Sequence, residues 1–123
     1  MNNKDFGFYL EEKTRKFAMM IICLSSSLPN TIELKVLKNQ LVKSGTSIGA
    51  NYREANTSRS KADFLNRIKI CQSEANETIY WLHLILEYQN NKNEKVKIGL
   101  KEAKELMAIF TSIISKIRYK NQQ

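Results

Sequence analysis

The sequence predicts an all-α fold, an antiparallel up-down-up-down four-helix bundle, and three observations carry that prediction. The 123 residues include one Pro and four Gly, which leaves few residues for the tight turns of a sheet protein. Four segments repeat apolar residues at alternating spacings of three and four, which is typical of a helix-bundle seam. The breaks between them, at 29–31, 56–60 and 90–93, are short, so consecutive helices should run antiparallel. This length has room for one hydrophobic core, and we expect a single domain over 1–123.

The first two helices are expected at about 5–28 and 32–55. The first ends before Pro29, which cannot continue a helix. Asn30 and Glu33 have the spacing of a capping box for the second. The apolar seam of the two helices consists of Leu10, Thr14, Phe17, Ile21, Leu24 and Leu28, and then Leu34, Leu37, Leu41, Gly45, Ile48, Tyr52 and Ala55.

The third and fourth helices are expected at about 61–90 and 94–119. Ser60 and Asp63 stand where an N-cap residue and an acid in the first helical turn are favoured. The seam continues through Phe64, Ile68, Cys71, Ala75, Thr78, Leu82 and Ile85, and then Val96, Leu100, Ala103, Met107, Phe110, Ile114 and Ile117.

The two cysteines, Cys23 and Cys71, predict neither a metal site nor a disulfide. Neither lies in a CxxC motif or near the single histidine, His83. In the bundle they sit on parallel helices with an axial offset of about ten residues, or roughly 15 Å at about 1.5 Å per residue. A disulfide tolerates at most roughly 7 Å between Cα atoms. We therefore expect two buried thiols in a reducing cytoplasm.

No segment of the sequence is expected to enter a membrane. The longest apolar run, 17–24, is far shorter than the roughly 18 to 20 residues of a spanning helix. Glu11 and Glu12 precede it, which is unlike a signal peptide. We expect a cytoplasmic protein without a membrane partner.

The helices carry more apolar surface than one core requires, because a second stripe lies about 100° around from the seam on three of them. Two interpretations are open: these residues flank the core, or they cover a surface for self-association, as large exposed apolar patches do. We favour self-association, in which Trp81 offers a large apolar area with a polar tip. The candidate interface residues are Tyr9, Met20, Ile70, Trp81, Leu84, Tyr88, Ile98, Ile109 and Ile113.

A group of small residues in the second helix predicts close approach to a neighbouring helix. Gly45 and Gly49 are four residues apart, and a helix tolerates glycine where another helix packs closely. Ser47 and Asn51 have the same spacing and are expected to hydrogen-bond across helices. A phosphate-binding turn is not supported, because no strand precedes the glycines and no Gly-Lys-Ser/Thr follows.

The chain is basic, with a formal net charge of +8, and the excess is uneven. Residues 34–73 carry eight basic side chains against two acidic, and 92–123 carry eight against three. Such a field favours polyanions through counterion release; the alternative is a solvated face that keeps the protein soluble. No base-reading motif is evident, so any binding of RNA or DNA should be sequence-tolerant. The candidate contacts are Lys35, Lys38, Lys43, Arg53, Arg59, Lys61, Arg67 and Lys69.

Catalysis has little support in the sequence. A di-iron bundle needs Glu-x-x-His, but Tyr80 stands three residues before His83. One histidine without a defined serine partner does not make a catalytic triad. We expect no enzymatic activity, no cofactor and no metal, with His83 in a structural or surface role. The alternative in a different class is a protein–protein adaptor whose charge is incidental.

The segments SGTSIGANYREA at 44–55, SKADF at 60–64, SEANE at 73–77 and WL at 81–82 resemble a known family. It is the four-helix-bundle family encoded in intervening sequences of bacterial 23S rRNA genes. The resemblance implies a homopentamer without established catalysis. Tyr-Arg-Glu-Ala at 52–55 departs from the Ile-Ala-Glu-Gly frequent there, which leaves the turn after the second helix open. A relative in fold is the basic, pentameric accessory protein of diversity-generating retroelements, which engages a reverse transcriptase and nucleic acid. The resemblance thus implies either an RNA-associated role or that of an accessory subunit.

Overall fold

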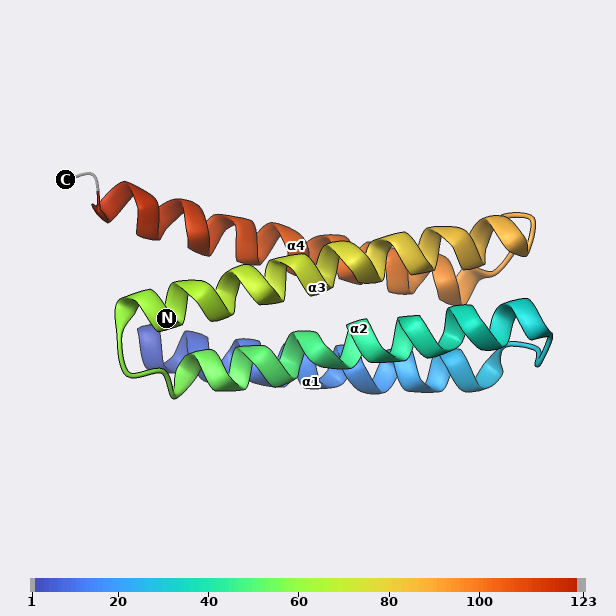
Figure 1. Cartoon of the computed structure of the whole chain (residues 1–123), viewed down its shortest axis with the longest axis horizontal. Helices are drawn as coiled ribbons and strands as arrows, with labels where there is room; N and C mark the ends of the chain where they lie inside the picture. Colours follow the sequence, from blue (N-terminus) through green and yellow to red (C-terminus); the bar gives the residue numbers. More distant parts are fainter. Residues whose placement is uncertain (1, 122–123) are drawn as a thin grey trace.

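The computed structural model describes residues 2–121 and contains four helices: α1 (Asn3–Ser27), α2 (Ile32–Asn56), α3 (Lys61–Tyr88) and α4 (Glu94–Asn121). They run up and down as a bundle, with both chain ends at the same end of the molecule (Figure 1). Each helix packs closely on the next and α4 also packs on α1, though less extensively, whereas the backbones of the diagonal pairs stay further apart within the described residues. The four helices therefore follow one another around the bundle, and the predicted fold class is confirmed.

The helix ends differ from the predicted ones by one or two residues, for local reasons. α1 begins earlier because the side chain of Asn2 accepts a hydrogen bond from the Asp5 backbone N–H at 2.8 Å. α3 ends at Tyr88 because Asn90 and Asn91 have φ angles of 57° and 60°. This left-handed conformation is one that asparagine tolerates better than most residues.

The predicted cap of α2 is wrong by one residue. Thr31, not Asn30, is the N-cap: its Oγ1 accepts from the Leu34 backbone N–H at 3.1 Å. Asn30 Oδ1 instead accepts from Lys38 Nζ at 2.8 Å. Both residue types can cap a helix, and only the path of the α1–α2 turn distinguishes them.

The predicted cap of α3 is confirmed, and α4 has one of the same kind. Ser60 Oγ accepts from the Asp63 backbone N–H at 3.1 Å. Asn93 Oδ1 accepts from the Val96 backbone N–H at 3.2 Å. Each bond satisfies one of the backbone donors that a helix start leaves without a partner.

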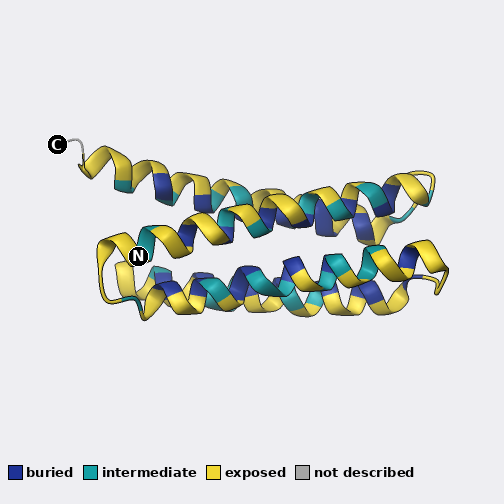
Figure 2. Ribbon diagram, viewed as in Figure 1, coloured by how far each residue is buried: buried dark blue, intermediate teal, exposed yellow. Residues whose placement is uncertain are grey.

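The core consists of the four predicted seams, which turn inward along the length of the bundle (Figure 2). Every predicted seam residue is buried except four that are half-buried: Leu37, Phe64, Met107 and Ile117. Two aromatic members meet across the bundle, where the rings of Tyr52 on α2 and Phe110 on α4 pack with centroids 6.0 Å apart.

The two cysteines are free, and only one of them is buried. Cys71 lies in the core with its Sγ 3.6 Å from the Ile48 carbonyl oxygen. Burial raises the pKa of its thiol to about 12. Cys23 is exposed, so its predicted burial is wrong: it lies two residues past Ile21, about 200° around the helix from that seam position.

We expect Cys23 to be alkylated within minutes at about pH 8 while Cys71 resists until the protein unfolds. A thiol with a pKa near 12 is ionised in only about one molecule in ten thousand at that pH, and the thiolate is the reactive form. Mass spectrometry after timed iodoacetamide labelling, with and without denaturant, measures this. Cys23→Ser is the control and should remove all labelling of the native protein. Rapid modification of Cys71 in that variant would contradict its burial.

Among residues 2–121, no helix is both long enough and apolar enough to span a bilayer.

Candidate nucleic-acid interface

Most basic side chains of this protein lack an acidic partner. Among residues 2–121, which include all twenty Lys and Arg, the salt bridges involve only Lys13, Arg15, Arg53 and Lys97. Most of these cations are therefore unpaired at the surface, and the formal net charge of +8 attracts polyanions.

The eight predicted contact residues do not form one patch. α2 has 25 residues and is about 37 Å long at about 1.5 Å per residue. Lys35 and Lys38 lie near its start, and Lys43 near its middle. The others lie at or beside the α2–α3 turn: Arg53, Arg59, Lys61, Arg67 and Lys69. All are exposed except Lys38.

Lys38 serves the fold. Its Nζ donates to the Leu28 carbonyl oxygen at 3.1 Å and to Asn30 Oδ1 at 2.8 Å. Both acceptors belong to the turn between α1 and α2, so Lys38 ties that turn to α2 and is half-buried. It is the weakest candidate of the eight for contact with a polyanion.

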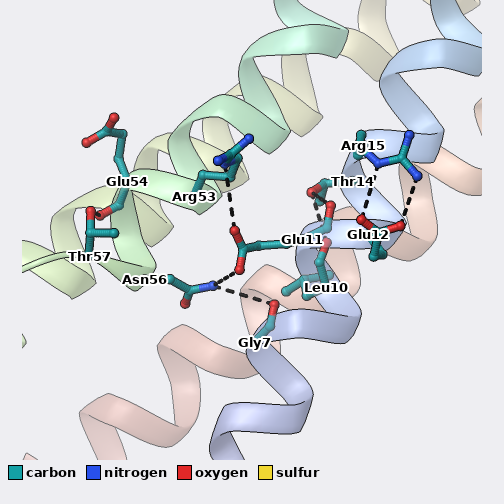
Figure 3. Close-up of polar contacts among 10 residues, drawn as sticks. All are labelled: Gly7, Leu10, Glu11, Glu12, Thr14, Arg15, Arg53, Glu54, Asn56 and Thr57. Carbon is teal, nitrogen blue, oxygen red and sulfur yellow. Dashed lines mark hydrogen bonds and ion pairs between the residues drawn. The ribbon is translucent and has the colours of Figure 1, made fainter.

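Arg53, on α2, and Arg67, on α3, make their contacts on different sides of α2. Arg67 Nη1 donates to Asn51 Oδ1 at 3.1 Å, across the α2–α3 side. Arg53 faces α1, where its Nε lies 3.8 Å from Glu11 Oε1 (Figure 3). Glu11 also accepts from Asn56 Nδ2 at 3.2 Å. These bonds join the end of α2 to the start of α1.

The predicted close-packing residues lie where α2 meets its neighbours. A Cβ placed on Gly45 would be 3.0 Å from the side chain of Ile21, and one on Gly49 would be 3.2 Å from Thr14 Oγ1. Asn51 bonds across to α3. The prediction that Ser47 bonds across helices is wrong: its Oγ donates to the Lys43 carbonyl oxygen at 2.7 Å, within α2.

One buried polar contact between α2 and α3 was missed by sequence reasoning. Thr78 Oγ1 lies 2.9 Å from Ser44 Oγ in the core and 2.7 Å from the Glu74 carbonyl oxygen. The signal was available, because both hydroxyl residues occupy or border seam positions in an otherwise apolar pattern. A buried hydroxyl needs a partner, so this pair fixes the register of α2 against α3.

Apolar residues on α3 and α2 form a surface that we call the α2/α3 patch. Tyr88 on α3 reaches α2, with its hydroxyl 3.5 Å from Glu33 Oε2. Val36 lies one turn from Glu33 on the same side and is 59% exposed; sequence reasoning missed it. The patch also holds Ile70, which is exposed, and Trp81 and Leu84, which are half-buried.

A second apolar surface, the α1/α4 patch, lies between α1 and α4. Lys13 Nζ on α1 pairs with Glu105 Oε2 on α4 at 3.7 Å, and Ile98 and Ile109 lie along the same stripe of α4 as Glu105. The predicted interface residues in this patch are Tyr9, Met20, Ile98, Ile109 and Ile113.

The second apolar stripe contains both kinds of residue that were considered: some flank the core, and others are exposed as a surface for self-association would be. Trp81, Met20, Ile109 and Ile113 are half-buried and pack against the core, as residues that flank a core do. In contrast, Tyr9, Ile70, Tyr88 and Ile98 are 40 to 56% exposed. The α2/α3 and α1/α4 sides are opposite one another, because the helices follow in order around the bundle.

The acidic residues in the middle of α3, Glu74 and Glu77, lie on the side that faces α2. Burial and the neighbouring charge of Glu77 raise the pKa of the Glu74 carboxyl. Glu77 Oε1 accepts from Trp81 Nε1 at 3.3 Å. Residues 2–121 contain no cluster of three His, Cys, Asp or Glu arranged to hold a metal ion, and His83 is exposed on α3.

Comparison with known proteins places this arrangement in a family. The family model described as 23S rRNA-intervening sequence protein matches residues 9–112. A crystal structure of a protein with unknown function from the S23 ribosomal protein family of Bacteroides thetaiotaomicron is similar, with a TM-score of 0.77 and 38% sequence identity. The similarity covers 85% of this chain and 96% of that one. No curated protein matches significantly.

Proposed function

The chain belongs to the family of 23S rRNA-intervening sequence proteins, and from that premise we propose that it is a non-enzymatic scaffold. It assembles as a homo-oligomeric ring and binds RNA or DNA through its basic surface. The observation that carries the proposal is the uncompensated charge: sixteen of the twenty Lys and Arg side chains form no salt bridge within residues 2–121.

Assembly is supported by the placement of the two apolar patches. They differ in composition and lie on opposite sides, so the α1/α4 patch of one copy would pack on the α2/α3 patch of the next. Such head-to-tail association forms a closed ring when the rotation closes. The family resemblance favours five copies. A ring also repeats the basic surface around its axis, which strengthens the field that attracts a polyanion.

Nucleic-acid binding should weaken steeply as salt rises, and weaken further when basic residues are removed. We expect the triple substitution Lys43→Gln, Arg59→Gln and Lys61→Gln to lower affinity for every RNA sequence alike. For a single strand, each lost phosphate contact should also reduce the slope of log K against log salt by about 0.7. Fluorescence anisotropy with a labelled RNA across a salt series measures both quantities.

The matched control replaces three exposed lysines elsewhere with Gln: Lys4, Lys16 and Lys92. It should change the affinity and the salt slope less than the first triple substitution does. Tight binding that survived both high salt and the triple substitution would place the site elsewhere. Absence of binding at low salt would reject the nucleic-acid part of the proposal.

That last result would favour the second candidate function, an adaptor such as an accessory subunit of a reverse transcriptase or another nucleic-acid enzyme. The exposure of Val36, Tyr88 and Ile98 favours this candidate, because exposed apolar residues grouped in patches are typical of protein–protein contact. In the adaptor, the basic charge has no role in recognition.

A further inference from the structure

A hollow of about 360 Å³ opens between the first half of α3 and the last turns of α4. This is within the roughly 300 to 1,000 Å³ of small-molecule sites. Gln72 Nε2 donates to Thr111 Oγ1 at 3.0 Å and so joins the two helices at the hollow. Tyr119, at the open end, is 64% exposed. The residues that line it include no acid: Gln72, Thr111, Ile114, Ser115, Arg118 and Tyr119.

A basic stripe of α4 leads away from the hollow, and we call the hollow and this stripe together the α3/α4 groove. Thr111 and Ser115 line the hollow, and positions spaced by three and four before them share their side of the helix. Among these, Lys101 and Lys104 are exposed and form no salt bridge within residues 2–121, and Lys97 pairs with Glu94 at 3.0 Å. The complete stripe consists of Lys97, Lys101, Lys104, Ala108, Thr111, Ser115 and Arg118.

The facing side of α3 is neutral or basic near the hollow. Lys69 and Asn76 lie one turn before and one turn after Gln72 on the same side of α3, and both are exposed. The nearest acids on α3, Glu74 and Glu77, face α2, and Glu105 of α4 faces α1 through its pair with Lys13. Acidic residues reach this groove only near the α3–α4 turn. The residues around the hollow are therefore neutral or basic.

We propose that this α3/α4 groove binds a single-stranded segment of nucleic acid, with one unstacked base in the hollow. The proposal rests on the proposed function: it names the ligand, and it adds a base-binding site to the phosphate contacts on α2 and the α2–α3 turn. Arg118 and Lys69 contact phosphates, the ring of Tyr119 stacks on the base, and Gln72 and Ser115 hydrogen-bond with it. The lysines of α4 follow the backbone away from the hollow.

A single strand fits these features better than a duplex. A duplex keeps its bases stacked, so a protein reads it through backbone and groove shape. An exposed aromatic ring beside an arginine, at the end of a basic groove, is the combination that binds splayed bases without sequence preference. The aromatic ring and the arginine are both on α4. Of the eight predicted contacts, Lys61, Arg67 and Lys69 are on the adjoining helix α3, and Arg67 bonds to α2 instead.

Two substitutions in the hollow test the proposal, with a labelled, unstructured oligouridine as the probe and the full chain as the protein. Tyr119→Ala should weaken binding at least about fivefold, the lower end for loss of a stacked aromatic. Arg118→Gln should weaken binding and lower the salt slope by about 0.7. The matched controls are Phe8→Ala and Arg15→Gln, which remove exposed residues of the same kinds from α1 and should leave affinity nearly unchanged.

A second measurement locates the base directly. Oligouridine that carries 5-iodouridine should photocrosslink to Tyr119, as mapped by mass spectrometry. Thermal melts and sedimentation verify that each variant is folded and assembled.

The outcomes separate the two proposals. If the wild-type protein binds and both variants bind as tightly as the wild type, the groove is rejected and binding through another basic surface stands. A clear preference for duplex over single strand also rejects the groove as proposed. Failure of the wild-type protein to bind any nucleic acid at low salt rejects both.

Discussion

Ile98→Asp is expected to convert the assembled ring into monomers of 14.3 kDa without unfolding them. Ile98 is 56% exposed on α4, so a carboxylate there remains solvated in the isolated chain. In the ring the same carboxylate would be buried in the apolar contact between two copies, which costs several kcal/mol for an unpaired charge. Sedimentation velocity at tens of micromolar, with circular dichroism to verify the fold, distinguishes dissociation from unfolding.

Ala108→Asp is the matched control, because Ala108 is exposed on α4 and lies on the stripe beside α3, outside both apolar patches. It should leave the ring intact. Trp81→Ala and Ile109→Asp are also expected to dissociate the ring, but both residues pack partly against the core, so their effect on stability has to be measured beside the sedimentation. A wild-type protein that sediments as a monomer at these concentrations would remove the argument for assembly.

Gly49→Leu is expected to lower the free energy of unfolding by about 1 to 3 kcal/mol or more. A Cβ at this position would already lie 3.2 Å from Thr14 Oγ1 and 3.4 Å from the Thr14 carbonyl carbon. The further carbons of leucine would have to displace backbone of α1, which cannot rotate away as a side chain can. The gain in helix propensity on replacing glycine, about 1 kcal/mol, offsets only part of that cost.

Thermal and urea unfolding measure this effect, and the next residue supplies the control. Ala50 is exposed, so Ala50→Leu should change stability by no more than about 0.5 kcal/mol. If Gly49→Leu instead raised the melting temperature, α1 and α2 would have to be further apart at this point than the contact with Thr14 implies.

The helix seams could be predicted because burial follows the period of the helix. Along each helix, apolar residues recur at spacings of three and four, and this repeat marks the face that turns inward in a bundle. Leu10, Ile48 and Phe110 are seam residues of α1, α2 and α4. The prediction for Ser60 and Asp63 was also correct, since a cap depends on residues within one turn. Asn30 and Thr31 show the limit of such local reasoning: two adjacent residues were suitable, and the path of the turn selected Thr31.

The basic surface was less predictable, because residues close in sequence diverge around a helix. Arg67 and Lys69 are two residues apart, or about 200° around α3. Consequently Arg67 bonds to α2 whereas Lys69 adjoins the hollow beside α4. The predicted contacts were chosen by position along the chain and omitted Arg118, which is distant in sequence from Gln72 and lines the same hollow.

The sequence by itself determined the fold class, the four seams and the family, because these depend on periodicity, short breaks and local motifs. Only the tertiary structure decided what those helices present to their surroundings. It placed the apolar patches on opposite sides, assigned Lys38 to the α1–α2 turn, and brought Gln72 to Thr111. The physical reason is that a surface is shared between helices, and its composition depends on how each helix is rotated against its neighbours.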